Sequence, residues 1–232
     1  MFGIGDPQRF LVHILYIIPA LLVGFTLHEF AHALVAVRLG DPTPKNQGRL
    51  SLDPRRHIHP LGALLVLLAG MGFAKPVQIN PRNLKGEWSQ LAVSLAGPAA
   101  NLAIAVVASI GIKLIASAFP DLPGLPSYGA SCYPLSPIDV VKAELYFMYT
   151  LNLVLMVFNL FPVPPLDGFE IIRTTLRKRN PRLLFRIEQN TDSIVLVFFV
   201  IALAASFILF FIINLVITPV SMLLGVHAAF PC

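Results

Sequence analysis

The chain has 232 residues, of which 56% are hydrophobic and 12% charged, and its mean hydropathy is +0.76. Soluble domains carry about 25% charged residues, and several apolar stretches here exceed the roughly 20 residues that cross a bilayer. The composition therefore predicts a polytopic membrane protein without a sizeable soluble domain. The net charge of +5 could suggest nucleic acid, but the basic residues lie in short loops between apolar stretches. They are better explained as topology signals and lipid-headgroup contacts, so we expect the bilayer and no nucleic acid as a partner.

The first predicted span runs from about Phe10 to Leu39 and ends at Gly40-Asp41-Pro42, where glycine and proline stop a helix. Inside it, His28, Glu29 and His32 form a His-Glu-x-x-His pattern. On a helix the two histidines lie one turn apart on one face, with the carboxylate beside them. This arrangement is typical of two zinc ligands with a general base next to the metal. The flanking residues are apolar, so a solvated, salt-bridging face is a poor alternative.

Two short segments after this span are extended in pattern and predict β-strands, one around Leu50 and one from Ala74 to Pro81. Between them, Leu61–Phe73 is apolar over only 13 residues, which favours a re-entrant or packed helix over a full span. His57 and His59 could share one face of a strand, which makes a second metal site conceivable. Two histidines at a membrane interface are the simpler interpretation.

Three further apolar stretches predict spans from about Leu91 to Phe119, Val140 to Phe161 and Ile194 to Leu224. Fourteen of the seventeen Lys and Arg residues follow the first span, the short apolar stretch or the Val140–Phe161 span. By the positive-inside rule these segments face the cytoplasm and the N-terminus lies outside. The predicted fold is an all-α polytopic membrane protein. It has about four long transmembrane helices, a short re-entrant or fifth helix, and short β segments near the cytoplasmic side.

A zinc site needs a third protein ligand besides two histidines, with water in the fourth position. Six residues near the cytoplasmic half are candidates: Asp41, Asp53, His57, His59, Asp167 and Glu170. Asp167 is the best choice on local chemistry, because it follows Pro162, Pro164 and Pro165 and precedes the flexible Gly168. Such a break within a membrane is tolerated only inside protein or along a water-filled cavity. The alternative is that Asp167 caps a helix starting at Gly168.

Three motifs occur in order: His28-Glu-Phe-Ala-His32, Gly97-Pro-Ala-Ala-Asn101 and Asn159-Leu-Phe-Pro-Val-Pro-Pro-Leu-Asp167-Gly168. Together they resemble the site-2 protease family, the zinc intramembrane metalloproteases of peptidase family M50. The stretch 73–83 also resembles the compact prokaryotic branch of that family. The similarity covers the chain from about residue 21 to 168, and the last span carries no diagnostic residue.

This resemblance implies one zinc ion per chain. The zinc ligands would be His28, His32 and Asp167, and Glu29 would be the catalytic acid and base. Asn159 matches an asparagine thought to contact the substrate or steady the reacting carbonyl. Asn101 matches a position of less certain role, where helix packing is an equal alternative.

We therefore expect one intramembrane metalloprotease domain over residues 1–232, with a catalytic core over about 10–168 and an additional span over about 194–224. It would hydrolyse peptide bonds in or near transmembrane segments of membrane proteins, in the cell membrane. If the first helix reaches the cytoplasmic surface near Arg38, His28 lies about 15 Å inside, nearer the cytoplasmic face. The alternative is a non-proteolytic membrane zinc-binding or transport protein, which would not need the carboxylate of Glu29.

Substrate access and regulation follow from the same reasoning. A transmembrane helix hides its peptide bonds, so the substrate must unwind, and the extended segments near Leu50 and Val77 could accept it as an added strand. Many relatives carry a PDZ domain between the second and third core spans, or a nucleotide-sensing domain at the C-terminus. Pro120–Asp139 is too short for the first and the chain ends soon after Leu224, so we expect neither.

Overall fold

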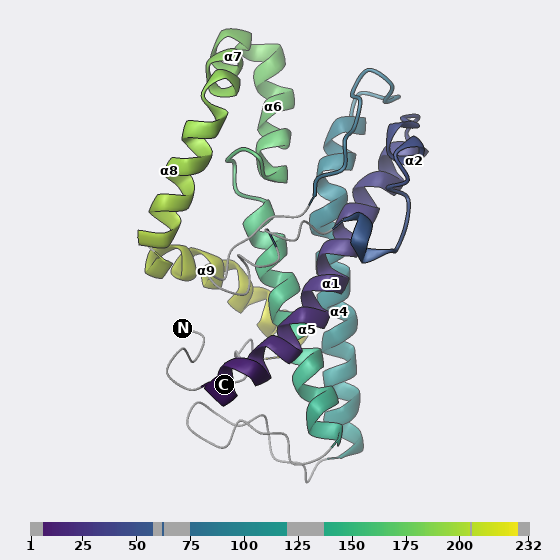
Figure 1. Cartoon of the computed structure of the whole chain (residues 1–232), viewed down its shortest axis with the longest axis vertical. Coiled ribbons are helices and arrows are strands. Elements are labelled where there is room, and N and C mark those ends of the chain that lie inside the picture. The colour runs from purple at the N-terminus through teal and green to yellow at the C-terminus, as the bar shows by residue number, and fades with distance from the viewer. Residues whose placement is uncertain (1–6, 58–61, 63–74, 120–136, 205, 227–232) are drawn as a thin grey trace.

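The computed structural model describes residues 7–57, 62, 75–119, 137–204 and 206–226 (Figure 1). Throughout these ranges the regular structure is helical. The elements are α1 (Pro7–Arg38), α2 (Thr43–Asn46), the 3-10 helix η1 (Pro54–Arg56), α4 (Ser89–Ala118), α5 (Pro137–Asn159), α6 (Asp167–Arg179), α7 (Pro181–Gln189), α8 (Thr191–Ala204) and α9 (Ser206–Leu224).

Among the described residues, three helices are long and apolar enough to cross a membrane: Ile14–Arg38 of α1, all of α4 and all of α5. They pack side by side, each against the other two (Figure 1). Small residues allow this close approach, as is typical of membrane helices. A Cβ atom on Gly24 of α1 would lie 3.0 Å from Oδ1 of Asn152 on α5, and one on Gly111 of α4 would lie 3.1 Å from Leu145. The first three predicted spans are thus present as helices.

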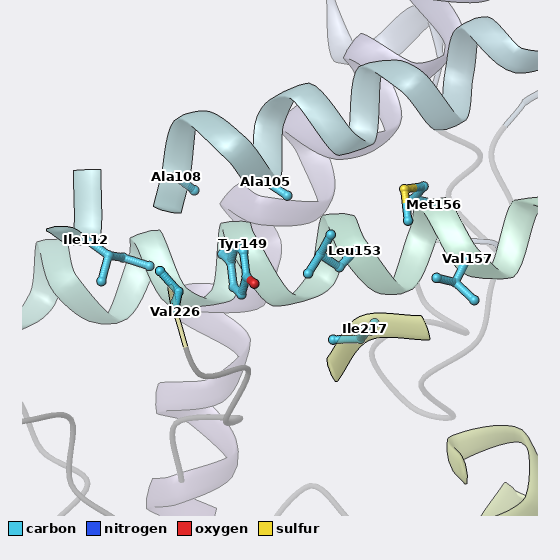
Figure 2. Packing of buried hydrophobic residues seen from close by; sticks show 9 residues of the cluster. All are labelled: Ala105, Ala108, Ile112, Tyr149, Leu153, Met156, Val157, Ile217 and Val226. Carbon is cyan, nitrogen blue, oxygen red and sulfur yellow. The ribbon is translucent and has the colours of Figure 1, made fainter. Parts of the chain in front are cut away.

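Helix α5 is buried on two faces. On one face it packs with α4 and α9, where nine buried residues form a cluster: Ala105, Ala108, Ile112, Tyr149, Leu153, Met156, Val157, Ile217 and Val226 (Figure 2). The Tyr149 hydroxyl donates to Ser221 Oγ at 2.8 Å, so this buried polar group is satisfied within the bundle. On the other face α5 packs against α1, where Tyr16 stacks on Phe147 with ring centroids 5.5 Å apart. Apolar burial on both sides fixes α5 between its neighbours.

The predicted β segments near Leu50 and Val77 are wrong for the part of the chain that the structure describes, which contains no strand there. An extended chain becomes a strand only when a second chain completes the ladder. In the segment near Val77, side-chain carboxylates accept the N–H groups that a partner strand would otherwise bind. Val77 N–H donates to Glu29 Oε2 at 3.0 Å, and Asn80 N–H donates to Asp41 Oδ2 at 2.7 Å. The predicted re-entrant stretch 61–73 lies outside the described residues except for residue 62, and so does His59.

The last predicted span, 194–224, is not one helix. The described residues form α8 with 14 residues and α9 with 19, and the chain changes direction between them (Figure 1). A continuous apolar sequence contains no angular information, so hydropathy alone could not reveal this bend. The preceding basic segment forms α6 and α7. Arg173 of α6 joins the two helices, because it pairs with Glu170 at 2.9 Å and with Glu188 of α7 at 2.7 Å.

Candidate metal centre

The predicted site residues on α1 meet Asp167 at the start of α6. The Nε2 atoms of His28 and His32 are 3.1 Å apart. One oxygen of Asp167 lies 3.2 Å from His28 Nε2 and the other lies 3.3 Å from His32 Nε2. These three residues are the group in the described chain that could hold a metal ion, with one ligand atom from each within 4.8 Å of the others. The alternative that Asp167 is a helix cap does not hold, since the N-cap of α6 is Leu166.

The other ring nitrogens determine which atoms face the cluster. His32 Nδ1 lies 2.7 Å from the carbonyl oxygen of Val93 on α4, and a carbonyl can only accept, so Nδ1 carries the proton. His28 Nδ1 lies 2.6 Å from Oδ1 of Asn101, also on α4. A ring with its proton on Nδ1 and none on Nε2 directs its Nε2 lone pair at the other ring and at the carboxylate. Metal-binding histidines typically donate their other ring N–H to a carbonyl or carboxylate in this way.

The cluster fits a cation better than it fits a set of internal hydrogen bonds. Among the described residues no hydrogen bond reaches the buried Oδ2 atom of Asp167. Gly97 of α4 also leaves space beside both rings, because a Cβ atom there would lie 2.3 Å from His32 Nε2 and 2.6 Å from His28 Nε2. Three electron-pair donors thus converge on space that an added methyl group would fill. Two histidines and one carboxylate are ligands that zinc accepts.

A close contact between α5 and α6 positions Asp167. A Cβ atom on Gly168 would lie 2.2 Å from the carbonyl oxygen of Leu160 and 2.4 Å from its carbon. Only glycine allows backbone to approach backbone so closely. The proline-rich turn after α5 therefore brings the first residue of α6 back against the end of α5, and Asp167 faces α1 across this junction.

Glu29 lies beside the cluster without belonging to it. Its side chain is buried, with the residue 6% exposed, and its Oε2 atom accepts the hydrogen bond from Val77 N–H. Together with His28, His32 and Asp167 it lines a cleft of about 1010 Å³. The site thus contains a carboxylate that faces the same space as the candidate ligands.

The rest of the cleft is formed by segments that are far apart in sequence. The non-helical segment 76–84 lines one part, α6 contributes Glu170, Arg173 and Arg177, and Val195 comes from α8. Asn159, at the end of α5, also lines it. Its Nδ2 atom donates to Leu155 O at 2.9 Å, and an amide nitrogen has a second hydrogen for another acceptor. Asn159 therefore lines the cleft, and its contact with the substrate stays a prediction.

Asn101 lies elsewhere. It is fully buried behind His28 and is not among the residues that line the cleft. Its amide contacts the ring of His28, Gly24 O at 3.5 Å and Asn152 Oδ1 at 2.7 Å. This position does not support a contact with substrate. Sequence reasoning did not single out Asn152, although a polar residue inside an apolar span is a signal for function.

The other candidates for a third ligand that the structure describes have partners away from the cluster. Asp41 is fully buried and accepts hydrogen bonds from Thr43, Asn80 and Asn83. Asp53 caps η1 by accepting from Arg55 N–H at 3.0 Å. His57 Nε2 lies 2.6 Å from Ser51 O, and Glu170 pairs with Arg173. The described residues therefore leave Asp167 as the partner of the two histidines.

Comparison with known proteins agrees with this geometry. The profile of peptidase family M50 matches residues 16–205, so the chain belongs to that family. The chain is 41% identical over 159 residues to the "Putative zinc metalloprotease YwhC" of Bacillus subtilis (strain 168), which is 68% of this chain and 67% of that protein. It is 32% identical over 189 residues to the "Putative zinc metalloprotease Rip2" of Mycobacterium tuberculosis (strain ATCC 25618 / H37Rv), covering 79% of this chain and 66% of the relative. The chain thus spans about two thirds of the length of these relatives. No solved structure is significantly similar to it.

Proposed function

We propose that the protein is an intramembrane zinc metalloprotease that hydrolyses peptide bonds in or near transmembrane segments of membrane proteins. The observation that carries this proposal is the convergence of His28, His32 and Asp167 within 4.8 Å of one another, next to a buried carboxylate that shares their cleft. The two histidines belong to a helix that is long and apolar enough to cross a membrane. Family membership supports the same activity.

In this proposal His28, His32 and Asp167 hold one zinc ion per chain. A zinc ion held there would supply a bound water with its pKa lowered towards ~7 and a Lewis acid for the scissile carbonyl. Glu29 accepts the proton of the attacking water and passes it to the leaving amine, a role that contributes about 10²- to 10⁴-fold in rate. The buried hydrogen bond from Val77 N–H holds the Glu29 carboxylate at the cleft.

Asn159 has a supporting role in this mechanism. Its amide lines the cleft, and one N–H remains for the substrate after the bond to Leu155 O. We assign to it a hydrogen bond to the oxygen that becomes negative as the carbonyl is attacked. A donor of this type is worth ~3 kcal/mol where it has been measured.

The substrate would bind as an unwound segment along residues 76–80. Pro76, Val77 and Ile79 line the cleft, and no strand pairs with this extended segment among the described residues. An unwound substrate can add to such a segment by main-chain hydrogen bonds. The segment around Leu50 does not line the cleft, so we propose residues 76–80 alone for this contact.

The proposed location is the cell membrane, with the site nearer the cytoplasmic face. Helix α1 ends at Arg38, ten residues beyond His28, which corresponds to about 15 Å along a helix. The basic residues that follow α1 and α5 favour a cytoplasmic position for this end of the bundle.

The test uses purified full-length protein and its Glu29→Gln variant. Zinc content is measured by mass spectrometry, and cleavage is measured with a panel of single-span membrane proteins. We expect one zinc per chain in both proteins and cleavage by the wild type alone. Zinc in both without cleavage by either would favour the alternative, a zinc-binding or transport protein.

A further inference from the structure

A chain of buried polar groups runs from the metal centre through three helices. His28 Nδ1 of α1 lies 2.6 Å from Asn101 Oδ1 of α4, and Asn101 Nδ2 donates to Asn152 Oδ1 of α5 at 2.7 Å. Asn152 Nδ2 in turn donates to the carbonyl oxygen of Met148, one turn earlier in α5, at 2.8 Å. Both asparagines are fully buried. Buried amides are costly unless their groups are paired. Here the oxygen and the nitrogen of each side-chain amide both have a hydrogen-bond partner.

The hydrogen bond from Asn152 to the Met148 carbonyl determines the direction of the other two hydrogen bonds in this chain of polar groups. A backbone carbonyl can only accept, so the NH₂ group of Asn152 must face Met148 and its oxygen must face Asn101. The NH₂ group of Asn101 then faces Asn152, and its oxygen faces the ring of His28. Since this oxygen can only accept, His28 Nδ1 must carry the proton. Turning either amide round would bring two donors or two acceptors together.

We propose that Asn152 is a positioning residue for the metal centre. Through Asn101 it fixes the tautomer and the ring orientation of His28, so that Nε2 presents its lone pair to the cation. Neither asparagine contacts the metal or the substrate. This inference rests on the proposed role of His28 as a ligand, and it adds a residue on α5, 124 positions further along the chain.

The packing of α1 on α5 supports this assignment. Gly24 lies one turn before His28, and a Cβ atom there would lie 3.0 Å from Asn152 Oδ1. The carbonyl oxygen of Gly24 also lies 3.5 Å from Asn101 Nδ2. The helix that carries His28 therefore leaves room for the Asn152 amide at the point where the two amides meet. Asn159 follows Asn152 by two turns on α5, so the same helix face supports the metal centre and lines the cleft.

The simpler interpretation is that Asn101 and Asn152 only hold α4 and α5 together, as interhelical amides do in membranes. The two roles differ in what they require. If the two residues only hold the helices together, the hydrogen bond between residues 101 and 152 can run in either direction. If Asn152 positions His28, residue 152 must accept this hydrogen bond. Aspartic acid in place of Asn152 can donate its O–H to Met148 O and still accept from Asn101. Leucine has a similar volume and can do neither.

The experiment measures zinc affinity by chelator competition and the visible absorption spectrum of the cobalt(II)-substituted protein, in the full chain. Asn152→Leu should weaken zinc binding about 10- to 100-fold, the range for outer partners of metal-binding histidines, and should change the cobalt spectrum. Asn152→Asp should restore both to within about threefold of the wild type. The matched control is Tyr149→Phe, which removes a buried interhelical hydrogen bond of α5 to Ser221 without a link to His28. It should leave zinc affinity and spectrum unchanged.

Wild-type zinc affinity and cobalt spectrum in folded Asn152→Leu would overturn the inference. If Asn152→Leu does not fold, Gly24→Ala tests the inference instead. Its new methyl group crowds Asn152 Oδ1 and both asparagines are kept. It should weaken zinc binding at least threefold, whereas Gly111→Ala, whose new Cβ meets only the Leu145 side chain, should not. Unchanged zinc affinity in Gly24→Ala would then overturn the inference. A wild type that binds zinc but cleaves nothing would remove the proposed function and leave this inference standing.

Discussion

The two sides of the cleft are held in different ways. On the metal side, His28 and His32 project from a long helix, and groups of α4 fix both rings through their Nδ1 atoms. On the opposite side, the segment 75–85 has no regular structure apart from turns. Glu29 accepts from the Val77 N–H of this segment, and Asp41 accepts from the Asn80 N–H and from the Asn83 side chain. The first arrangement fixes metal geometry before a substrate arrives. The arrangement of the segment 75–85 leaves some of its main-chain groups at the cleft, where a substrate peptide could bind them.

This difference separates two kinds of variant. Changes on the metal side should lower zinc affinity and activity together. Changes in the segment 75–85 should lower the rate of cleavage while zinc stays bound. This separation is tested by Asp167→Ala, Gly97→Ala and Gln78→Pro.

Asp167→Ala should have the largest effect on zinc. It removes one of three proposed ligands, so zinc affinity should fall by more than about 100-fold, the upper range for outer partners. Cleavage should be lost with it. Chelator competition measures this loss, and Glu170→Ala is the control, because Glu170 lines the same cleft outside the cluster. Full zinc retention in Asp167→Ala would show that the third ligand is another residue.

Gly97→Ala should weaken zinc binding without removing any ligand. The new methyl group would lie 2.3 Å from His32 Nε2, so the rings must move apart and we expect at least about a tenfold loss of zinc affinity, comparable to the loss of an outer partner. The control is Gly111→Ala in the same helix, where the methyl group meets a leucine side chain at 3.1 Å. Equal zinc affinities for the two variants would mean that the space beside Gly97 is not where the metal binds.

Gln78→Pro should slow cleavage and leave zinc unchanged. Proline removes a backbone N–H from the segment that lines the cleft, so a substrate strand loses a main-chain partner there. We expect a fall in kcat/KM of about tenfold, equivalent to about one hydrogen bond. Ser51→Pro is the control, because Ser51 does not line the cleft. If both variants cleave at the wild-type rate, residues 76–80 do not bind the substrate as a strand.

Asp41→Asn should have a smaller, pH-dependent effect on stability. Although burial opposes it, hydrogen bonds from Thr43, Asn83 and Asn80 lower the pKa of the Asp41 carboxyl below its usual value. A lowered pKa in the folded state stabilises the protein above the usual value of about 4 and loses this contribution as the pH falls through the lowered value. The variant should be about 1–3 kcal/mol less stable at pH 7, and the difference should shrink towards pH 3. Thermal unfolding in detergent measures it, and a difference independent of pH would contradict the assignment.

Much of the site could be predicted from the sequence because its residues are chemically out of place. His28, Glu29 and His32 interrupt an apolar span, and Asp167 follows a proline-rich break. Such residues are costly in a membrane, so their positions carry information about function. Apolar length was equally informative for the first three long helices.

The remaining features depend on contacts between distant parts of the chain. The segment near Val77 was predicted as a strand, but its N–H bonds to a carboxylate 48 residues earlier. The bend between α8 and α9 has no counterpart in hydropathy. The role of Asn101 was left open between substrate contact and packing, because its partners His28 and Asn152 lie 73 and 51 residues away. Sequence spacing identifies which residues carry chemistry, whereas tertiary packing determines what each of them contacts.

The most direct test of the metal centre is X-ray absorption spectroscopy of the zinc-loaded wild type. We expect only nitrogen and oxygen atoms bound to the zinc, at about 2.0–2.2 Å, with scattering from two imidazole rings. In Asp167→Ala loaded with excess zinc, one oxygen scatterer should be lost while both imidazoles remain. A sulfur ligand, a different number of imidazoles, or a coordination shell unchanged in every respect by Asp167→Ala would contradict this expectation.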